Sequence, residues 1–204
     1  MATPLSVTPS QIPNVQSVGP GGQVYIGNLF GGFQIKSKTL NPLFTFSQTD
    51  GNVKFAKVMT NLVEASKIGS TMAFVAQQLG VRVLKMGNSP ASAQEIHDMK
   101  RLLASARVVV EYGSNRTIVG EFTGLHFQNT EEFSAESATD KAIAHAGPMN
   151  SSAWCALPIA IPLQPNINIG GTVEFGIDVP ASLIVADQEW VFVVVMAGQK
   201  STTA

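Results

Sequence analysis

Apolar residues alternate with polar or small residues along much of the second half of the chain. In the segment 157–169 every odd position is apolar. The alternation resumes after Gly170-Gly171 and ends at Pro180. Because successive side chains of a strand point to opposite faces, this pattern predicts strands with one buried face. Prolines cannot donate ladder hydrogen bonds, so 157–169 is expected to be an edge strand, or two strands broken near Gln164-Pro165-Asn166.

Three further segments favour strands. Residues 107–112 and 116–127 flank Gly113-Ser114-Asn115, which is a turn signal, and together they predict a hairpin. Gly120 and Gly124 indicate a bulge or bend in its second arm. The run from Trp190 to Met196 is continuously apolar and rich in β-branched residues, which is typical of a strand covered on both faces. Residues 43–47 predict a short strand after Pro42.

Helical patterns are few. Ser92 and Glu95 have the spacing of a capping box, and an apolar stripe follows from Ile96 to Leu103. Residues 52–65 are compatible with a weaker helix, although they include β-branched residues. Residues 71–86 fit either a strand or a helix, with the end of the segment favouring a strand. Together the patterns predict a mainly-β fold, an eight-stranded jelly-roll β-sandwich with one or two short helices in connections.

The N-terminal residues differ in composition from the rest of the chain. Residues 1–22 contain four prolines among Ser, Thr, Gln and Asn, and such a stretch cannot build a core by itself. The glycine-punctuated segment 19–32 carries apolar residues that favour docking over exposure. We therefore expect an extended N-terminal arm over residues 1–35, a single jelly-roll domain over 36–200 and a C-terminal tail over 201–204.

Charge is scarce and unevenly distributed. Asp, Glu, Lys and Arg make up 13% of the chain, against about 25% in ordinary soluble domains. No charged residue precedes Lys36, and between Lys141 and Glu174 only His145 and Cys155 are ionisable. Because buried charge is costly, contact surfaces are depleted in charged residues. The arm 1–35 and the segment 142–173 are therefore the expected surfaces for self-association, although a neutral secreted or periplasmic β-domain would also be poor in charge.

No pattern predicts catalytic, cofactor-binding or metal-binding residues, and no cofactor or small-molecule substrate is expected. His97, His126 and His145 lack the close spacing of metal ligands, and Cys155 follows Trp154 in an apolar context. The densest acidic cluster is interpreted as a solvated loop: Glu131, Glu132, Glu136 and Asp140. The net charge is −1 and close basic pairs are confined to 36–38 and 100–101, so specific nucleic-acid binding is not expected.

The start of the chain has no signal-peptide pattern, and its one cysteine suits a reducing compartment. The longest apolar run, 190–197, is far too short to span a bilayer. These observations favour a reducing compartment over secretion.

The order of the strand patterns resembles that of the single jelly-roll capsid proteins of tailless icosahedral viruses, especially bacterial viruses. Five segments carry the resemblance: Val108–Tyr112, Gly147-Pro148-Met149, Leu157–Leu163, Val173–Val179 and Trp190–Met196. It covers roughly residues 40–200 and is a likeness of pattern and order, without a diagnostic motif.

The resemblance implies two four-stranded sheets, repeated in a virion shell, with terminal arms that bridge subunits. The chain is too short for a double jelly roll. The expected partners are copies of the chain itself, with other virion proteins and an underlying virion membrane left open. The resemblance implies no catalytic or ligand-binding residue. Two competing hypotheses remain, a virion spike or carbohydrate-binding β-sandwich and a cupin-like enzyme.

Overall fold

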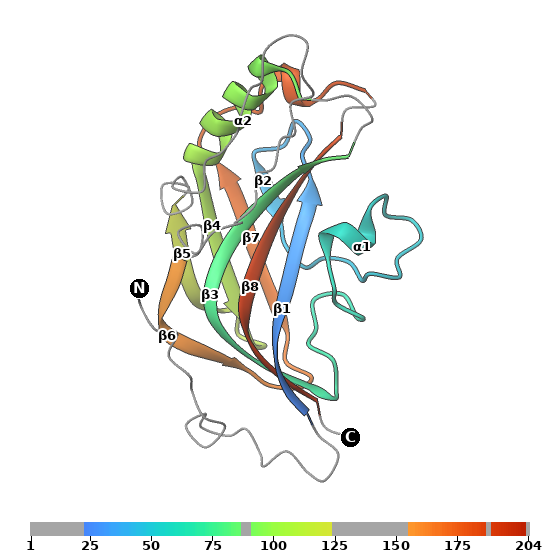
Figure 1. Ribbon diagram of the computed structural model, residues 1–204, viewed down its shortest axis with the longest axis vertical. Helices are drawn as coiled ribbons and strands as arrows, with labels where there is room; N and C mark the ends of the chain where they lie inside the picture. Colours follow the sequence, from blue (N-terminus) through green and yellow to red (C-terminus); the bar gives the residue numbers. More distant parts are fainter. Residues whose placement is uncertain (1–22, 87–90, 124–154, 187–188, 203–204) are drawn as a thin grey trace.

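The computed structural model describes residues 23–86, 91–123, 155–186 and 189–202. Strands dominate these ranges (Figure 1). In chain order the elements are β1 (Gln23–Gln34), β2 (Leu40–Pro42), α1 (Ala56–Met59), β3 (Met72–Lys85), α2 (Ala93–Ala104), β4 (Ala106–Tyr112), β5 (Thr117–Thr123), β6 (Cys155–Leu163), β7 (Ile169–Phe175), the 3-10 helix η4 (Ala181–Leu183) and β8 (Trp190–Thr202).

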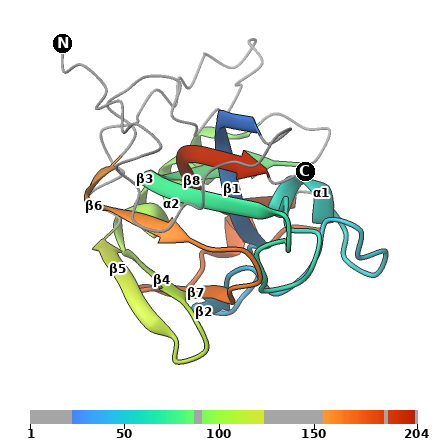
Figure 2. The same cartoon turned by 90° about the horizontal axis from the view of Figure 1, so that it is seen from below.

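The strands form two antiparallel sheets that pack face to face. Within the described residues each sheet has four strands, in the orders β1-β8-β3-β6 and β2-β7-β4-β5. Figure 2 shows the two sheets as separate layers. The prediction of a mainly-β sandwich with few helices is therefore confirmed.

The pairing follows a simple rule along the chain. The first strand pairs with the last, β2 pairs with β7, β3 pairs with β6, and β4 and β5 form a hairpin. The pairs β3–β8 and β4–β7 then join these ladders into the two sheets. Connections consequently gather at two ends of the sandwich. We call the end with α2 and η4, which contact each other, the helix end, and the end with the β4–β5 turn the turn end (Figure 1).

The main core lies between the two sheets, where apolar side chains from the inner face of each sheet meet. Phe33 and Phe192 stack with ring centroids 5.3 Å apart, and Phe175 from the opposite sheet meets Phe192 edge-on at 5.9 Å. Aromatic pairs in such offset or edge geometries add stability beyond their buried area. This aromatic cluster therefore ties the two sheets together.

A second, smaller core explains why β8 is apolar on both faces. The outward side chains of Val191, Val193 and Val195 are buried against Met59. Partly buried aromatic residues of the same connection, Phe46 and Phe55, pack beside them. The chain between β2 and β3 therefore covers part of the outer face of this sheet. We call residues 46–59 the cover. The prediction that Trp190–Met196 is covered on both faces is confirmed.

The boundaries of the predicted arm and tail are corrected by the structure. Residues 23–34 form β1, which pairs with β8 from Gln23–Thr202 to Gln34–Val191, so they belong to the sandwich. Ser201 and Thr202 belong to β8 and not to a tail. Leu29 and Phe33 of β1 are buried in the core of their own chain, so this segment docks within the subunit. The remainder of the arm, residues 1–22, lies outside the described residues.

The two predicted helices have different outcomes. Helix α2 begins at a capping box, in which Ser92 Oγ accepts from Glu95 N and Glu95 Oε2 accepts from Ser92 N, as the sequence predicted. The helix expected over 52–65 shrinks to α1, a single turn. Phe55, at its N-cap, has a φ of 65°, which interrupts any longer helix. The ambiguous segment 71–86 is the strand β3.

The strand predictions for the second half are largely confirmed. The 107–127 hairpin is β4–β5 as far as Thr123, and its register shifts between Val110 and Glu111, next to the predicted bulge at Gly120. Strand β6 is an edge strand, and the chain breaks before β7 at Asn166, which has a φ of 62°. The alternation that continued to Pro180 outlasts β7, which ends at Phe175.

Candidate assembly surfaces and a polar pocket

The outer face of the β2-β7-β4-β5 sheet is charged and solvated. Arg107 Nε lies 2.7 Å from Glu121 Oε1, and Arg107 Nη1 lies 3.4 Å from Glu174 Oε2. The hydrogen bond and positive charge of Arg107 lower the pKa of the Glu121 carboxyl. These side chains are about half exposed, and exposed ion pairs add little stability. This outer face is therefore suited to contact with solvent.

The opposite outer face carries almost no charge. One row crosses all four strands at Ile26, Gln199, Val75 and Pro162, and none of these side chains is ionisable. Among the described residues, the cover packs on the part of this sheet nearer the helix end. Beyond it, Ile26 and Pro162 at the two ends of the row are exposed, Ile26 to 87%, whereas Val75 between them is buried. Contact surfaces of proteins are depleted in charged residues in the same way.

The β1 edge of this sheet is closed by its own chain. Asn61 Oδ1 accepts from Phe30 N at 3.0 Å, and Asn61 Nδ2 donates to Asn28 O at 2.7 Å. An isolated bridge between Gly31 and Thr60 continues the closure. The amide of Asn61 thus pairs with β1 as a neighbouring strand would. Natural sheets protect their edges against unwanted pairing by such devices.

The β5 and β6 edges, by contrast, lie at the ends of their sheets and flank an apolar groove. The groove has a volume of about 440 Å³. Its apolar walls come from β5, β6 and the end of β4: Tyr112, Ile118, Phe122, Leu157, Ile161 and Pro162. Ile118 is 60% exposed at its rim. The described part of the predicted contact segment 142–173 includes β6, so this groove and that segment meet; residues 142–154 lie outside the described residues.

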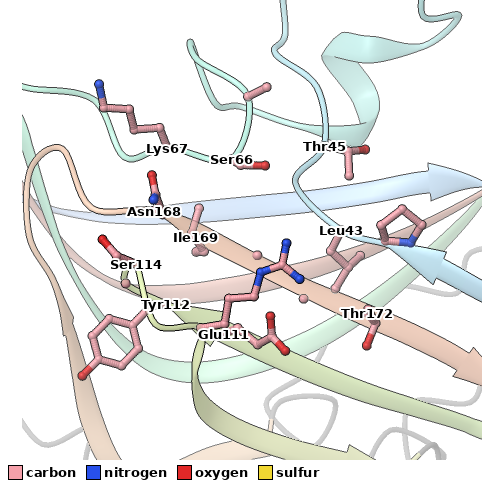
Figure 3. Close-up of a pocket in the computed structure, with 16 residues that line it drawn as sticks. Leu43, Thr45, Ser66, Lys67, Glu111, Tyr112, Ser114, Asn168, Ile169 and Thr172 are labelled. Atoms are coloured by element: carbon pink, nitrogen blue, oxygen red, sulfur yellow. The ribbon is translucent and has the colours of Figure 1, made fainter.

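The turn end holds a polar pocket of about 400 Å³ (Figure 3). Four segments meet there: 42–45, 65–67, 111–116 and 168–172. Gly113 N donates to Asn168 O at 2.8 Å, and Lys67 forms a bridge with Asn168, so these segments hold one another in place. Ser66 and Arg116 both have positive φ angles, of 56° and 50°. Strained backbone of this kind persists only where its surroundings impose it.

The helix end contains the one ion pair of the described residues in which both side chains are deeply buried. Lys85 Nζ lies 2.7 Å from Glu95 Oε1, with 6% and 7% of the two side chains exposed, and 5.7 Å from the centroid of the Trp190 ring. Burial raises the pKa of Glu95, but the hydrogen bonds from Lys85 and Ser92 and the charge of Lys85 outweigh it and lower that pKa overall. This network anchors α2 on the sandwich.

A second carboxylate strengthens the same anchor. Asp98 Oδ2 accepts from Ser182 Oγ of η4 at 2.6 Å and from Gln94 Nε2 at 2.8 Å. These two hydrogen bonds lower the pKa of Asp98. Hydrogen bonds to a charged carboxylate are stronger than neutral ones, so Asp98 fixes α2 against η4. The role of both carboxylates is structural.

Of the residues weighed in the sequence for chemistry, the two that the structure describes, His97 and Cys155, lie on different elements. His97 is exposed on α2, and Cys155 is a half-buried free thiol at the start of β6. His126 and His145 lie outside the described residues, as does the acidic cluster 131–140. Across the described ranges no group of three or more His, Cys, Asp or Glu residues could hold a metal ion.

The sequence predicted no ligand pocket, and the polar pocket was missed. Its walls come from segments more than 100 residues apart, and each segment alone is an ordinary turn or strand end. The sequence did not indicate the positive φ angles at Ser66 and Arg116 either, because neither residue is a glycine.

Comparisons with known proteins add no relative to this description. No protein-family model matches the chain, and no curated protein matches its sequence. Among the helices of the described ranges, none is long and apolar enough to cross a membrane.

Proposed function

We propose that this chain is a single jelly-roll coat protein, a structural subunit that assembles with copies of itself into an icosahedral virion shell. The observation that carries the proposal is the pair of strand orders β1-β8-β3-β6 and β2-β7-β4-β5. A jelly roll arises when the first half of a chain pairs antiparallel with the second half in reverse order and the ladder rolls into two sheets. Viral capsid subunits are prominent users of that fold, beside lectins and cupins.

The distribution of charge supports a coat subunit among the users of this fold. One outer face carries Arg107 with Glu121 and Glu174, while the row of Ile26, Gln199 and Val75 on the other face is uncharged. A shell subunit needs such a difference, because its two surfaces meet different surroundings. An isolated soluble domain has no need of it.

Assembly would proceed through apolar contact at the β5–β6 groove and the uncharged face. Burial of apolar area supplies the driving force, and polar contacts at the rims set the angle between neighbouring copies. The Asn61 closure restricts pairing at the β1 edge, which leaves the β5–β6 side for a directed contact. A repeated contact of fixed angle closes into a symmetric shell.

Residues 1–22 are proposed to act as a clamp between subunits. They carry no charge, and they lead into β1 at the end of the sheet where Gln23 pairs with Thr202. Other virion proteins and a membrane beneath the shell are further proposed partners. The assembled virion would form in the host cytoplasm without specific nucleic-acid binding by this chain.

Expression of the full chain tests the proposal directly. Size-exclusion chromatography and negative-stain microscopy should reveal closed shells. Ile118→Glu, which puts a charge on the groove rim, should give folded subunits that do not form closed shells. Val63→Glu is the matched control, because Val63 is 65% exposed and Ile118 60%. Shells from Ile118→Glu would exclude the groove as a contact, and a stable monomer or trimer of the unaltered chain would favour the alternative, a virion spike or carbohydrate-binding module.

A further inference from the structure

The polar pocket at the turn end gathers side chains that have no partner among the described residues. In the described part of the chain, Glu111, Arg116 and Asn168 form no side-chain hydrogen bond or ion pair, although all three line the same cavity. The same is true of three hydroxyl groups around it: those of Thr45, Ser114 and Thr172. Arg107, on the same face of the sheet, forms ion pairs with Glu121 and Glu174. The lack of side-chain partners is therefore a property of the pocket and not of the whole face.

These groups suit a ligand that both donates and accepts hydrogen bonds. A carboxylate accepts, a guanidinium donates, and amides and hydroxyls do both. Figure 3 shows Glu111, Asn168 and Thr172 around the cavity, arising from strands β4 and β7 and the loop that precedes β7. A polyhydroxylated ring presents matching donors and acceptors around its whole perimeter.

The charge of the pocket favours a neutral ligand. Lys67, at its rim, is paired with Glu64 at 3.1 Å. Glu111 and Arg116 contribute one charge of each sign, so the lining is balanced. An anionic ligand would meet the Glu111 carboxylate, and a cationic ligand would meet Arg116.

The floor of the pocket is open because glycine residues, Gly170 and Gly171, form it. A β-carbon at Gly170 would meet only Glu111 Oε2, at 3.9 Å, which is an ordinary contact. Packing therefore does not require a glycine at position 170. It does require one at position 171, where a β-carbon would collide with Val109 O. A bare glycine in a strand allows close approach of a ligand.

We propose that this pocket binds a neutral glycan unit, a hexopyranose or disaccharide. Its ring hydroxyls would bond to Glu111, Arg116 and Asn168. A volume of about 400 Å³ accommodates one or two sugar rings and lies within the range of small-ligand sites. The pocket would give the subunit a glycan-recognition activity in addition to shell formation.

The test uses the unassembled full-length chain. An array of neutral and acidic oligosaccharides identifies the best neutral disaccharide, which is then titrated to about 10 mM by ligand-observed NMR, since single-site sugar affinities are near the millimolar range. Gly170→Val should fill the pocket and lower the affinity at least ten-fold. Glu111→Gln and Arg116→Asn should each lower it about five-fold, and asparagine tolerates the positive φ at position 116.

Gly51→Val is the matched control, because no heavy atom lies within 4 Å of a β-carbon there and Gly51 does not line the pocket. It should bind as the unaltered protein does. Absence of neutral-glycan binding, binding confined to acidic glycans, or binding unaffected by Gly170→Val would each overturn the proposal. Shell formation is recorded separately by microscopy, so failure of the coat-protein proposal and failure of the glycan site give different results.

Discussion

Gly198 shows how tightly the centre of the β1-β8-β3-β6 sheet is packed, and Gly51, between β2 and α1, serves as the comparison. Gly198 of β8 lies beside the irregularity of β3 between Ala76 and Gln78, and a β-carbon there would collide with Val75 O. A clash with backbone cannot be relieved by a side-chain rotation. Gly198→Ala should therefore cost about 3 kcal/mol of unfolding free energy, whereas Gly51→Ala should change it by less than about 0.5 kcal/mol. Urea unfolding measures both; equal midpoints would contradict the described packing.

Asn61 provides a second test at the level of one side chain. Asn61→Ala removes the partners of Phe30 N and Asn28 O, and should cost about 1 kcal/mol. Asn61→Asp keeps the acceptor but places a carboxylate against the carbonyl of Asn28, so it should also destabilise. Because Asn61→Ala frees the β1 edge, light scattering should detect aggregates larger than the closed shells proposed for the unaltered protein. If association does not increase, the edge is protected by something else.

Helix α2 is held by carboxylates, so its attachment depends on pH. The folded-state pKa values of Glu95 and Asp98 lie below their ordinary values of 4.5 and 3.8. Their stabilisation is therefore complete above about pH 4.5 and is lost as the pH falls through the lower, folded-state values. Thermal unfolding from pH 7 to pH 3 should show this fall in Tm, and Asp98→Asn should make it shallower. A parallel pH profile for the variant would contradict the assignment.

Glu95→Gln should destabilise the protein even at pH 7. The substitution replaces the carboxylate beside the buried Lys85 with a neutral amide, and removal of one member of a buried pair costs about 3–5 kcal/mol. Lys85→Met with Glu95→Leu removes both charges and should recover much of the loss. Chemical denaturation of the three proteins compares these free energies. A double variant as unstable as Glu95→Gln would show that the pair itself is stabilising.

Elements whose causes lie within a few residues were predictable. The start of α2 follows from Ser92 and Glu95, and the hairpin follows from its turn residues. Strand β1 was assigned to an arm because its partner, β8, lies at the other end of the chain and its own sequence is glycine-rich. Residues 52–65 were compatible with a helix, yet Val53 and Phe55 pack against the outward valines of β8 in the second core.

At the scale of the whole molecule, two deletions separate the arm from the sandwich. Removal of residues 1–22 should leave a folded, soluble domain that fails to form closed shells. Removal of residues 1–35 also removes β1, with the buried Leu29 and Phe33, and should abolish folding. Circular dichroism and microscopy distinguish the two outcomes. Normal particles from the shorter deletion would rule out the clamp, and a folded product of the longer deletion would contradict the role of β1.

The surfaces were predictable in part and the polar pocket was not. Missing charge pointed to residues 142–173, and the described half of that segment does border the apolar groove. The charge contrast between the two outer faces needs the strand register, since Arg107 and Glu174 meet only through the β4–β7 ladder. The polar pocket is formed by four segments, and predicting it requires the complete strand topology. The local sequence of each segment does not indicate which other segments lie beside it.

The pairing of β1 with β8 also has a consequence during protein synthesis. Gln23 emerges from the ribosome long before its partner, Thr202. Strand β8 is thus made after both of its neighbours in the sheet, β1 and β3, and loop closure over so many residues makes folding slow. A nascent chain that has not reached β8 has no completed sheet, so it cannot yet join an assembly.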